Sequence, residues 1–261
     1  MNMTLKEPYY MIEFSASAVM FEIRINDVPL LTLNVKGQAS TVVPMNYLIL
    51  ESGKQQLNIT VLPVLGKMDF IKNSSFRATV KLFDVVNGFK FIEDSVNYKT
   101  PSIDEDKPIP VFNYQGVFYA EVPYKLVAWQ NSTDLSEIED LQGKVDKQYS
   151  HVEDIIKSQK YNSLRKMLEQ RENNMAISMY LSEEEKNSRI DDLIKDIENG
   201  FVVVPRMLTD KLMIYGNNKL VSLKKENGSS ALLLRNEKIK EDLNLDLMLH
   251  IEQGSKELSI I

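Results

Sequence analysis

The spacing of hydrophobic residues changes twice along this chain, and these changes decide which structures it can form. Up to about residue 130, apolar residues recur at every second position, as at Phe21, Ile23 and Ile25. This alternation is typical of β-strands with one buried face. From about 134 to 199 the spacing is that of helices, and after Gly200 the strand pattern returns. The sequence therefore predicts an α+β protein.

The first segment, residues 1–130, is predicted to be an antiparallel β-sandwich domain. Its alternating stretches are short and are separated by turn residues such as Lys36-Gly37 and Asn87-Gly88. Asn-Gly is the strongest of these hairpin signals, because both residues tolerate a positive φ. Seven or eight strands at this spacing are typical of a sandwich. We expect no helix longer than two turns before Trp129.

The second segment, residues 131–261, is predicted to be an α+β domain in which helices pack on an antiparallel sheet. Asp134 can cap the first helix, and Ser182 with the acidic residues after it can cap the last one. A glycine at position 200 is suited to end that helix. The helices are expected over about 134–199, and the strands that follow are expected at 211–215, 219–224, 231–235, 245–252 and 257–261.

Charge and cysteine content exclude several classes of function. The net charge is −6, and the nearest basic cluster is only Lys219, Lys224 and Lys225. Binding to nucleic acid needs a larger basic surface, so we expect no nucleic-acid partner. The chain has no cysteine, which rules out disulfides and thiolate chemistry. With no signal peptide and no apolar run long enough to span a bilayer, we expect a cytoplasmic protein without a membrane partner.

No motif of catalysis, metal binding or cofactor binding is present. The two histidines, His151 and His250, lie on different predicted elements, whereas a zinc site needs three or four ligands. The chain lacks GxSxG, phosphate-loop and dinucleotide-binding patterns. The acidic stretch 104–106 lacks the alternating acids and glycine of a calcium loop. We therefore expect no metal, no cofactor and no catalytic residue, and the sequence leans away from an enzyme.

The leading hypothesis for function is a non-enzymatic protein-binding or accessory protein, for example an immunity-type factor. The acidic cluster of Glu183, Glu184 and Glu185 is the candidate docking site, because such clusters attract basic partners. The alternative is a small-ligand or carbohydrate-binding protein, or a carboxylate-dependent hydrolase with a pocket in the C-terminal domain. A deep, water-excluded pocket in the C-terminal domain with converging Asp or Glu would favour the alternative, and a flat or grooved acidic surface would favour the protein-binding hypothesis.

Overall fold

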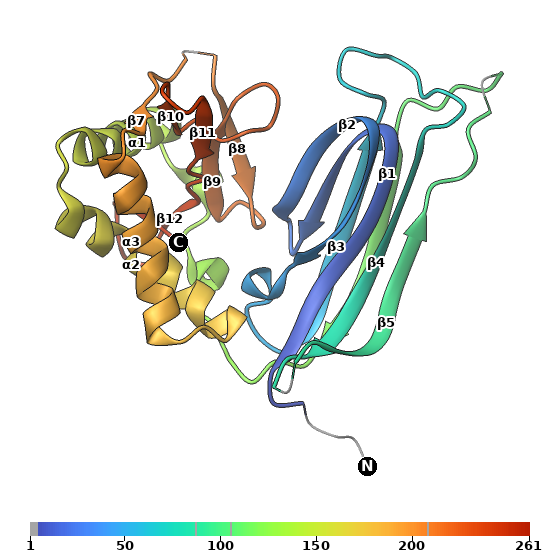
Figure 1. The fold of residues 1–261 in the computed structure, drawn as a ribbon, viewed down its shortest axis with the longest axis horizontal. Coiled ribbons are helices and arrows are strands. Elements are labelled where there is room, and N and C mark those ends of the chain that lie inside the picture. Colours follow the sequence, from blue (N-terminus) through green and yellow to red (C-terminus); the bar gives the residue numbers. More distant parts are fainter. Residues whose placement is uncertain (1–4, 87, 105, 208) are drawn as a thin grey trace. The chain divides into compact units, whose positions relative to one another are not determined.

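The computed structural model describes residues 5–86, 88–104, 106–207 and 209–261. The chain forms two compact units, unit 1 (Met1–Leu126) and unit 2 (Val127–Ile261). Figure 1 shows unit 1 as a curled sheet and unit 2 as helices with short strands. Among the described residues, no helix is both long and apolar enough to cross a lipid bilayer.

Unit 1 contains a single antiparallel sheet that curls strongly into a half-barrel (Figure 1). The path through the sheet is β5-β4-β1-β3-β6, and β2 also pairs with β1. Its strands are β1 (Pro8–Ile25), β2 (Val28–Pro44), β3 (Gly53–Leu62), β4 (Ser75–Asp84), β5 (Lys90–Lys99) and β6 (Phe112–Ala120). The described residues of unit 1 contain one short helical turn, η1 (Asn46–Leu48), which confirms the expectation that no long helix occurs there.

The curl of the sheet comes from a bend within β1. Ala18 has a φ of 47°, and the pairing of β1 with β2 shifts register between Ser17 and Val19. The extra residue lies in β2, where Lys36 and Gly37 stand opposite the single residue Ala18, and a bulge of this kind bends a pair of strands without ending it. The first half of β1 therefore pairs with β4 and the second half with β3, while β2 follows both halves.

The prediction of a two-sheet sandwich is wrong, because β1 and β2 continue through the bend and keep the strands in one sheet. Lys36-Gly37, predicted as a turn, lies inside β2. The other predicted hairpin signal, at Asn87-Gly88, falls partly outside the described residues, since position 87 is not described. The strands on either side of it, β4 and β5, pair in antiparallel fashion.

The core of unit 1 lies inside the curl, where the two halves of the sheet face each other. The rings of Phe14 and Phe21, on opposite sides of the bend, have centroids 5.0 Å apart. Tyr10 of β1 lies 6.0 Å from Phe118 of β6, measured between ring centroids. A single curled sheet therefore encloses this core, whereas the sandwich prediction had placed the core between two sheets.

The described residues of unit 2 form three α-helices and two small antiparallel sheets. The helices are α1 (Leu141–Lys157), α2 (Tyr161–Met179) and α3 (Glu183–Glu198). One sheet has the order β11-β10-β7 and the other β13-β12-β9-β8, so the single sheet predicted here is in fact divided. The strands are β7 (Val202–Val203), β8 (Lys211–Tyr215), β9 (Leu220–Lys224), β10 (Leu233–Asn236), β11 (Glu241–Asn244), β12 (Leu249–Ile251) and β13 (Leu258–Ile260).

The predicted cap is found at the start of α3, whereas α1 begins later than its predicted cap. Ser182 and Glu185 form a reciprocal capping box at the start of α3. Asp134 does cap a turn, because its side chain accepts the N–H of Ser136 at 2.9 Å, but that turn is a single 3-10 turn. The first α-helix begins only at Leu141, where Asp140 supplies the cap.

Tyr149 fastens α1 to the strands of unit 2. Its ring is fully buried, and its hydroxyl accepts the N–H of Leu223 at 2.9 Å. The same hydroxyl donates to the carbonyl of Leu247 and contacts the hydroxyl of Ser222, both at 3.2 Å. Burial raises the pKa of Tyr149 to about 12.

Alkaline pH is expected to weaken unit 2 through this tyrosine. The unfolded chain loses the phenol proton near pH 10.0 and the folded chain only near pH 12, so stability is complete below pH 10 and falls between these values. The loss approaches about 3 kcal/mol. Urea unfolding followed by the fluorescence of Trp129, the one tryptophan, measures it. Tyr149→Phe should lack this component, and an equal alkaline fall in that variant would contradict the assignment.

Candidate interaction surface

The edges of a sheet carry unpaired backbone groups and can accept a further strand, so we compared the edges of unit 1. Strand β5 is protected at its edge. Its pairing with β4 contains two register shifts, between Val80 and Lys81 and between Leu82 and Phe83. Glu93 adds charge to this exposed strand. Bulges and charges of this kind hinder pairing with another chain.

Strand β6 faces β5 across the opening of the half-barrel. The ring of Tyr98 on β5 stacks on the ring of Tyr114 on β6, with centroids 4.6 Å apart. This stacked pair occupies part of the space that a strand added to either edge would need. The edge of β6 is therefore partly covered from within unit 1.

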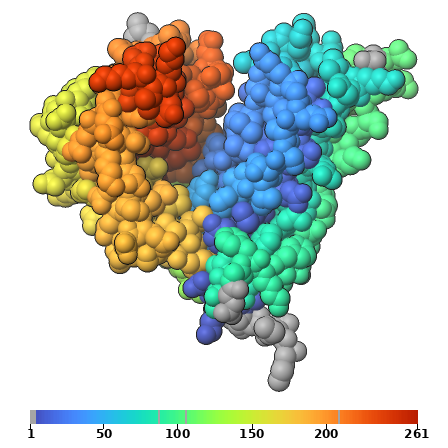
Figure 2. Space-filling view, in the orientation of Figure 1, coloured from blue at the N-terminus to red at the C-terminus, as the bar shows by residue number. Residues whose placement is uncertain are grey.

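Over residues 38–43, the outer edge of β2 has neither the bulges and charges that protect β5 nor the ring stack that partly covers β6. The segment reads Gln-Ala-Ser-Thr-Val-Val, without charge or proline, and its pairing with β1 is regular over this stretch. Among the described residues, no strand pairs with this edge. Figure 2 shows residues of β2, in blue, on the visible surface of unit 1. We call residues 38–43 the β2 edge.

The direction of the backbone groups on the β2 edge follows from the pairing. Met45 donates its N–H to the carbonyl of Tyr10, which fixes the alternation along the ladder. By that alternation, Gln38, Ser40 and Val42 turn their N–H and C=O groups away from β1. All three of these residues are exposed.

The side chains of the β2 edge continue the core face of the sheet. Ala39 and Thr41 lie opposite the buried residues Ala16 and Phe14 of β1. Because paired residues share a face, the small side chains of the edge leave part of the core face uncovered. A partner strand could extend the core there.

A cavity of about 400 Å³ with a mixed polar and apolar lining adjoins β2 at the bend. It is lined by Lys36 of β2 together with Val64, Leu65 and Ile71 from the loop between β3 and β4. The N–H of Leu65 bonds to the side chain of Asn34 on β2 at 3.0 Å, which ties this loop to the strand. The cavity can accept an apolar side chain at one end of the β2 edge.

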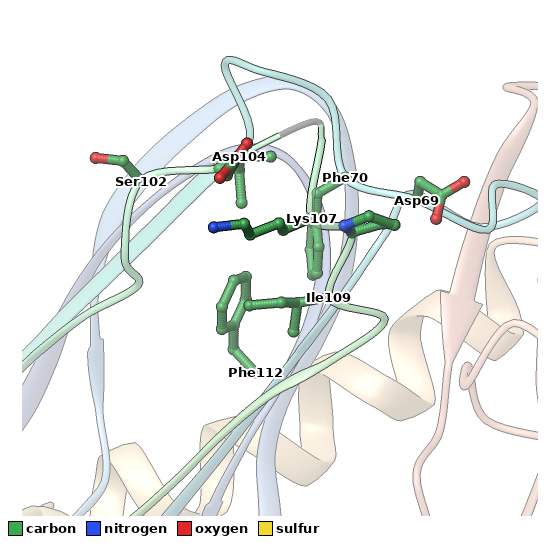
Figure 3. A pocket seen from close by; sticks show the side chains of 9 residues that line it. Asp69, Phe70, Ser102, Asp104, Lys107, Ile109 and Phe112 are labelled. Carbon is green, nitrogen blue, oxygen red and sulfur yellow. The ribbon is translucent and has the colours of Figure 1, made fainter.

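A second cavity of about 410 Å³ lies among the loops of unit 1. The rings of Phe70 and Phe112 form its apolar wall, with centroids 5.0 Å apart. Lys107 extends into the space between Asp104 and Phe112 (Figure 3). Asp104 accepts the N–H of Asp106 at 3.1 Å, so one of its oxygens is used within its own turn.

The predicted docking residues Glu183, Glu184 and Glu185 have three different surroundings. Glu185 is held by Ser182 in the capping box, and this contact lowers its pKa. Glu183 pairs with Lys186 at 2.5 Å. Only Glu184 has no side-chain partner among the described residues. The cluster that the sequence suggested is therefore largely engaged in starting α3.

The two histidines lie on different elements, as expected, and their surroundings differ. His151 is exposed on α1 and lines an open cavity of about 690 Å³. His250 is buried, its Nδ1 lies 2.7 Å from the hydroxyl of Ser132, and burial lowers its pKa. No described residue bonds to its Nε2, and its burial leaves no access for a substrate. The contact with Ser132 joins the segment around that residue to β12.

Two of the three residues of the lysine cluster have hydrogen-bond partners. Lys224 pairs with Asp246 at 2.5 Å, and Lys219 donates to the carbonyl of Gln130 at 2.5 Å. Within the described ranges, no three His, Asp or Glu side chains are placed to hold a metal ion. Comparison with protein-family models, curated proteins and solved structures gives no match. The geometry of the chain itself therefore carries the functional argument.

Proposed function

We propose that this chain is a protein-binding module that receives an extended segment of a partner protein on the β2 edge. The observation that supports this most strongly is the contrast between the edges of one sheet. Strand β5 carries bulges and charges, β6 is partly covered, and residues 38–43 of β2 carry none of these features. Strand addition to an open edge is a common mode of peptide recognition.

The edge specifies the chemistry of the partner. Gln38, Ser40 and Val42 offer backbone donors and acceptors, and each bond formed contributes about 0.5–1.5 kcal/mol net. Every second side chain of the added strand lies over the small residues of the core face, so we expect apolar, β-branched residues there. The cavity beside Lys36 suits one larger apolar side chain. An immunity-type factor is one form of this proposal, and Glu184 is a further candidate contact for a basic partner.

A proline at Ser40 tests the proposal. Ser40→Pro removes an outward N–H and no backbone bond to β1. It also removes the hydrogen bond from the Ser40 hydroxyl to the carbonyl of Phe14 at 3.0 Å, a single side-chain contact, so the fold should persist. Peptides selected against the wild-type protein from a random library should bind the variant at least about tenfold more weakly. In the wild-type complex, amide exchange at Gln38, Ser40 and Val42 should slow.

Asn97→Pro on β5 is the matched control, because Asn97 occupies an exposed position on an edge strand of the same sheet. It should leave peptide affinity unchanged. Equal binding by Ser40→Pro, or protection confined to amides outside residues 38–43, would refute strand addition at this edge.

A further inference from the structure

A small cavity in unit 2 is lined by charged residues around the buried Glu172, and the proposed function does not use them. The cavity measures about 280 Å³, just below the range of about 300–1,000 Å³ typical of pockets for drug-sized ligands. It lies among α2, α3 and β11, and its apolar lining includes Leu168, Leu193 and Leu245. Its size suits a small molecule with an aliphatic part.

The charged wall of this cavity has two arginines around one buried carboxylate. The side chain of Glu172 is only 6% exposed, and Arg189 donates to it from Nε at 2.6 Å. Arg171 lies on the other side, with its Nε 3.6 Å from the second oxygen. That distance is too long for a hydrogen bond. Two guanidinium groups therefore share one carboxylate, which leaves one positive charge in excess.

Several N–H donors of these two arginines have no acceptor within the described part of the chain. The side chain of Arg171 is 25% exposed, and no described residue accepts a hydrogen bond from it. The Nε of Arg189 donates to Glu172, and the terminal nitrogens of Arg189 have no acceptor among the described residues. Burial lowers the pKa of Arg171, but an arginine stays charged in a protein. A desolvated guanidinium with open donors matches the geometry of a carboxylate.

The remaining charges give the cavity a direction. Asp192 and Asp196 also line it from α3, and Asp192 is paired with Lys195 at 3.0 Å. Asp196 follows Arg189 by two helical turns and is unpaired among the described residues. Asp246, which also acts on Arg171, is held by Lys224. The positive end of the cavity is thus at the arginines, and the negative end is further along α3.

We infer that this cavity binds a small organic carboxylate, whose charged group bonds to Arg171 and Arg189 and whose aliphatic body packs against the leucines. The site lies in unit 2 and is independent of the β2 edge. An acid of this kind supplies the acceptors that the arginines lack. Its neutral amide has the same shape but carries no charge to compensate theirs.

The test uses the full chain with 4-methylpentanoate and, as its neutral counterpart, 4-methylpentanamide. Titration followed by nuclear magnetic resonance should show saturable binding of the acid, with a Kd of about 1 mM. The Nε–Hε signal of Arg171 should move in the wild-type protein, which shows contact without any mutation. The amide should bind at least about tenfold more weakly.

Two matched variants complete the test. Arg171→Gln should weaken binding of the acid by at least about tenfold. Arg165→Gln changes an arginine on the same helix that pairs with Asp191 and does not line the cavity, so it should bind as the wild type does. Equal affinity for acid and amide, an unmoved Arg171 signal, or no saturation by about 20 mM acid would overturn the proposal.

Discussion

Replacing Glu172 by alanine is expected to destabilise unit 2 by about 2–3 kcal/mol. Glu172 lies between Arg171 and Arg189, and its side chain is only 6% exposed. Removing it leaves two partly buried guanidinium groups with no carboxylate between them. Losing the carboxylate leaves both charges uncompensated, but the side chains of Arg171 and Arg189 are 25% and 39% exposed, so water solvates them in part and the cost stays below that of a fully buried pair. Urea unfolding followed by Trp129 fluorescence measures the change.

The control for this variant is an ion pair between the same two helices. Asp191 of α3 pairs with Arg165 of α2, but these side chains are 42% and 40% exposed. Asp191→Ala should therefore cost no more than about 1 kcal/mol. Similar losses of stability for Glu172→Ala and Asp191→Ala would mean that burial does not determine how much the Glu172 ion pairs contribute to the free energy of unfolding.

A valine at position 18 is expected to destabilise unit 1 by about 3 kcal/mol. Ala18 is buried and has a φ of 47°, in the left-handed region that β-branched residues avoid. Valine adds both backbone strain and side-chain volume at the bend of β1. Hydrogen exchange of peptides from β1 and β4 should report the loss, since these strands meet beside the bend.

Two further variants separate strain from overpacking. Ala16→Val adds the same volume at a buried position of β1 without a positive φ, so it should show the packing cost alone. Ala18→Gly relieves strain and should change stability by less than about 1 kcal/mol. If Ala16→Val and Ala18→Val lose equal stability, the left-handed conformation at Ala18 makes no contribution.

The sequence predicted local structure best at the start of α3, where neighbouring side chains decide it. The reciprocal bonds of Ser182 and Glu185 start α3 as their spacing indicated. The alternating pattern located the strands of unit 1. It could not show that β1 and β2 continue past Ala18 and Gly37, because alanine carries no signal for a positive φ. Gly37 was interpreted as a turn, yet it lies within a strand and lacks a positive φ.

The candidate sites were harder to predict, because they depend on residues that are distant in the chain. Arg189 meets Glu172 only because α3 packs on α2, and no spacing rule links those positions. The β2 edge was missed for a different reason, since an open edge is a property of the whole sheet. A usable signal was present in the uncharged run 38–43, in contrast to the charged strand β5.

The long bent strand β1 also sets the order in which unit 1 can fold. Ile25 pairs with Val28, across a turn in which Asn26 and Asp27 both have a positive φ. The same strand pairs at its other end with Asp84, through Pro8. Because the entropy of closing a loop rises with its length, the β1–β2 hairpin should form first and the contact with β4 late. We therefore expect the slow step in the folding of unit 1 to be the pairing of this hairpin with strands that are distant in the sequence.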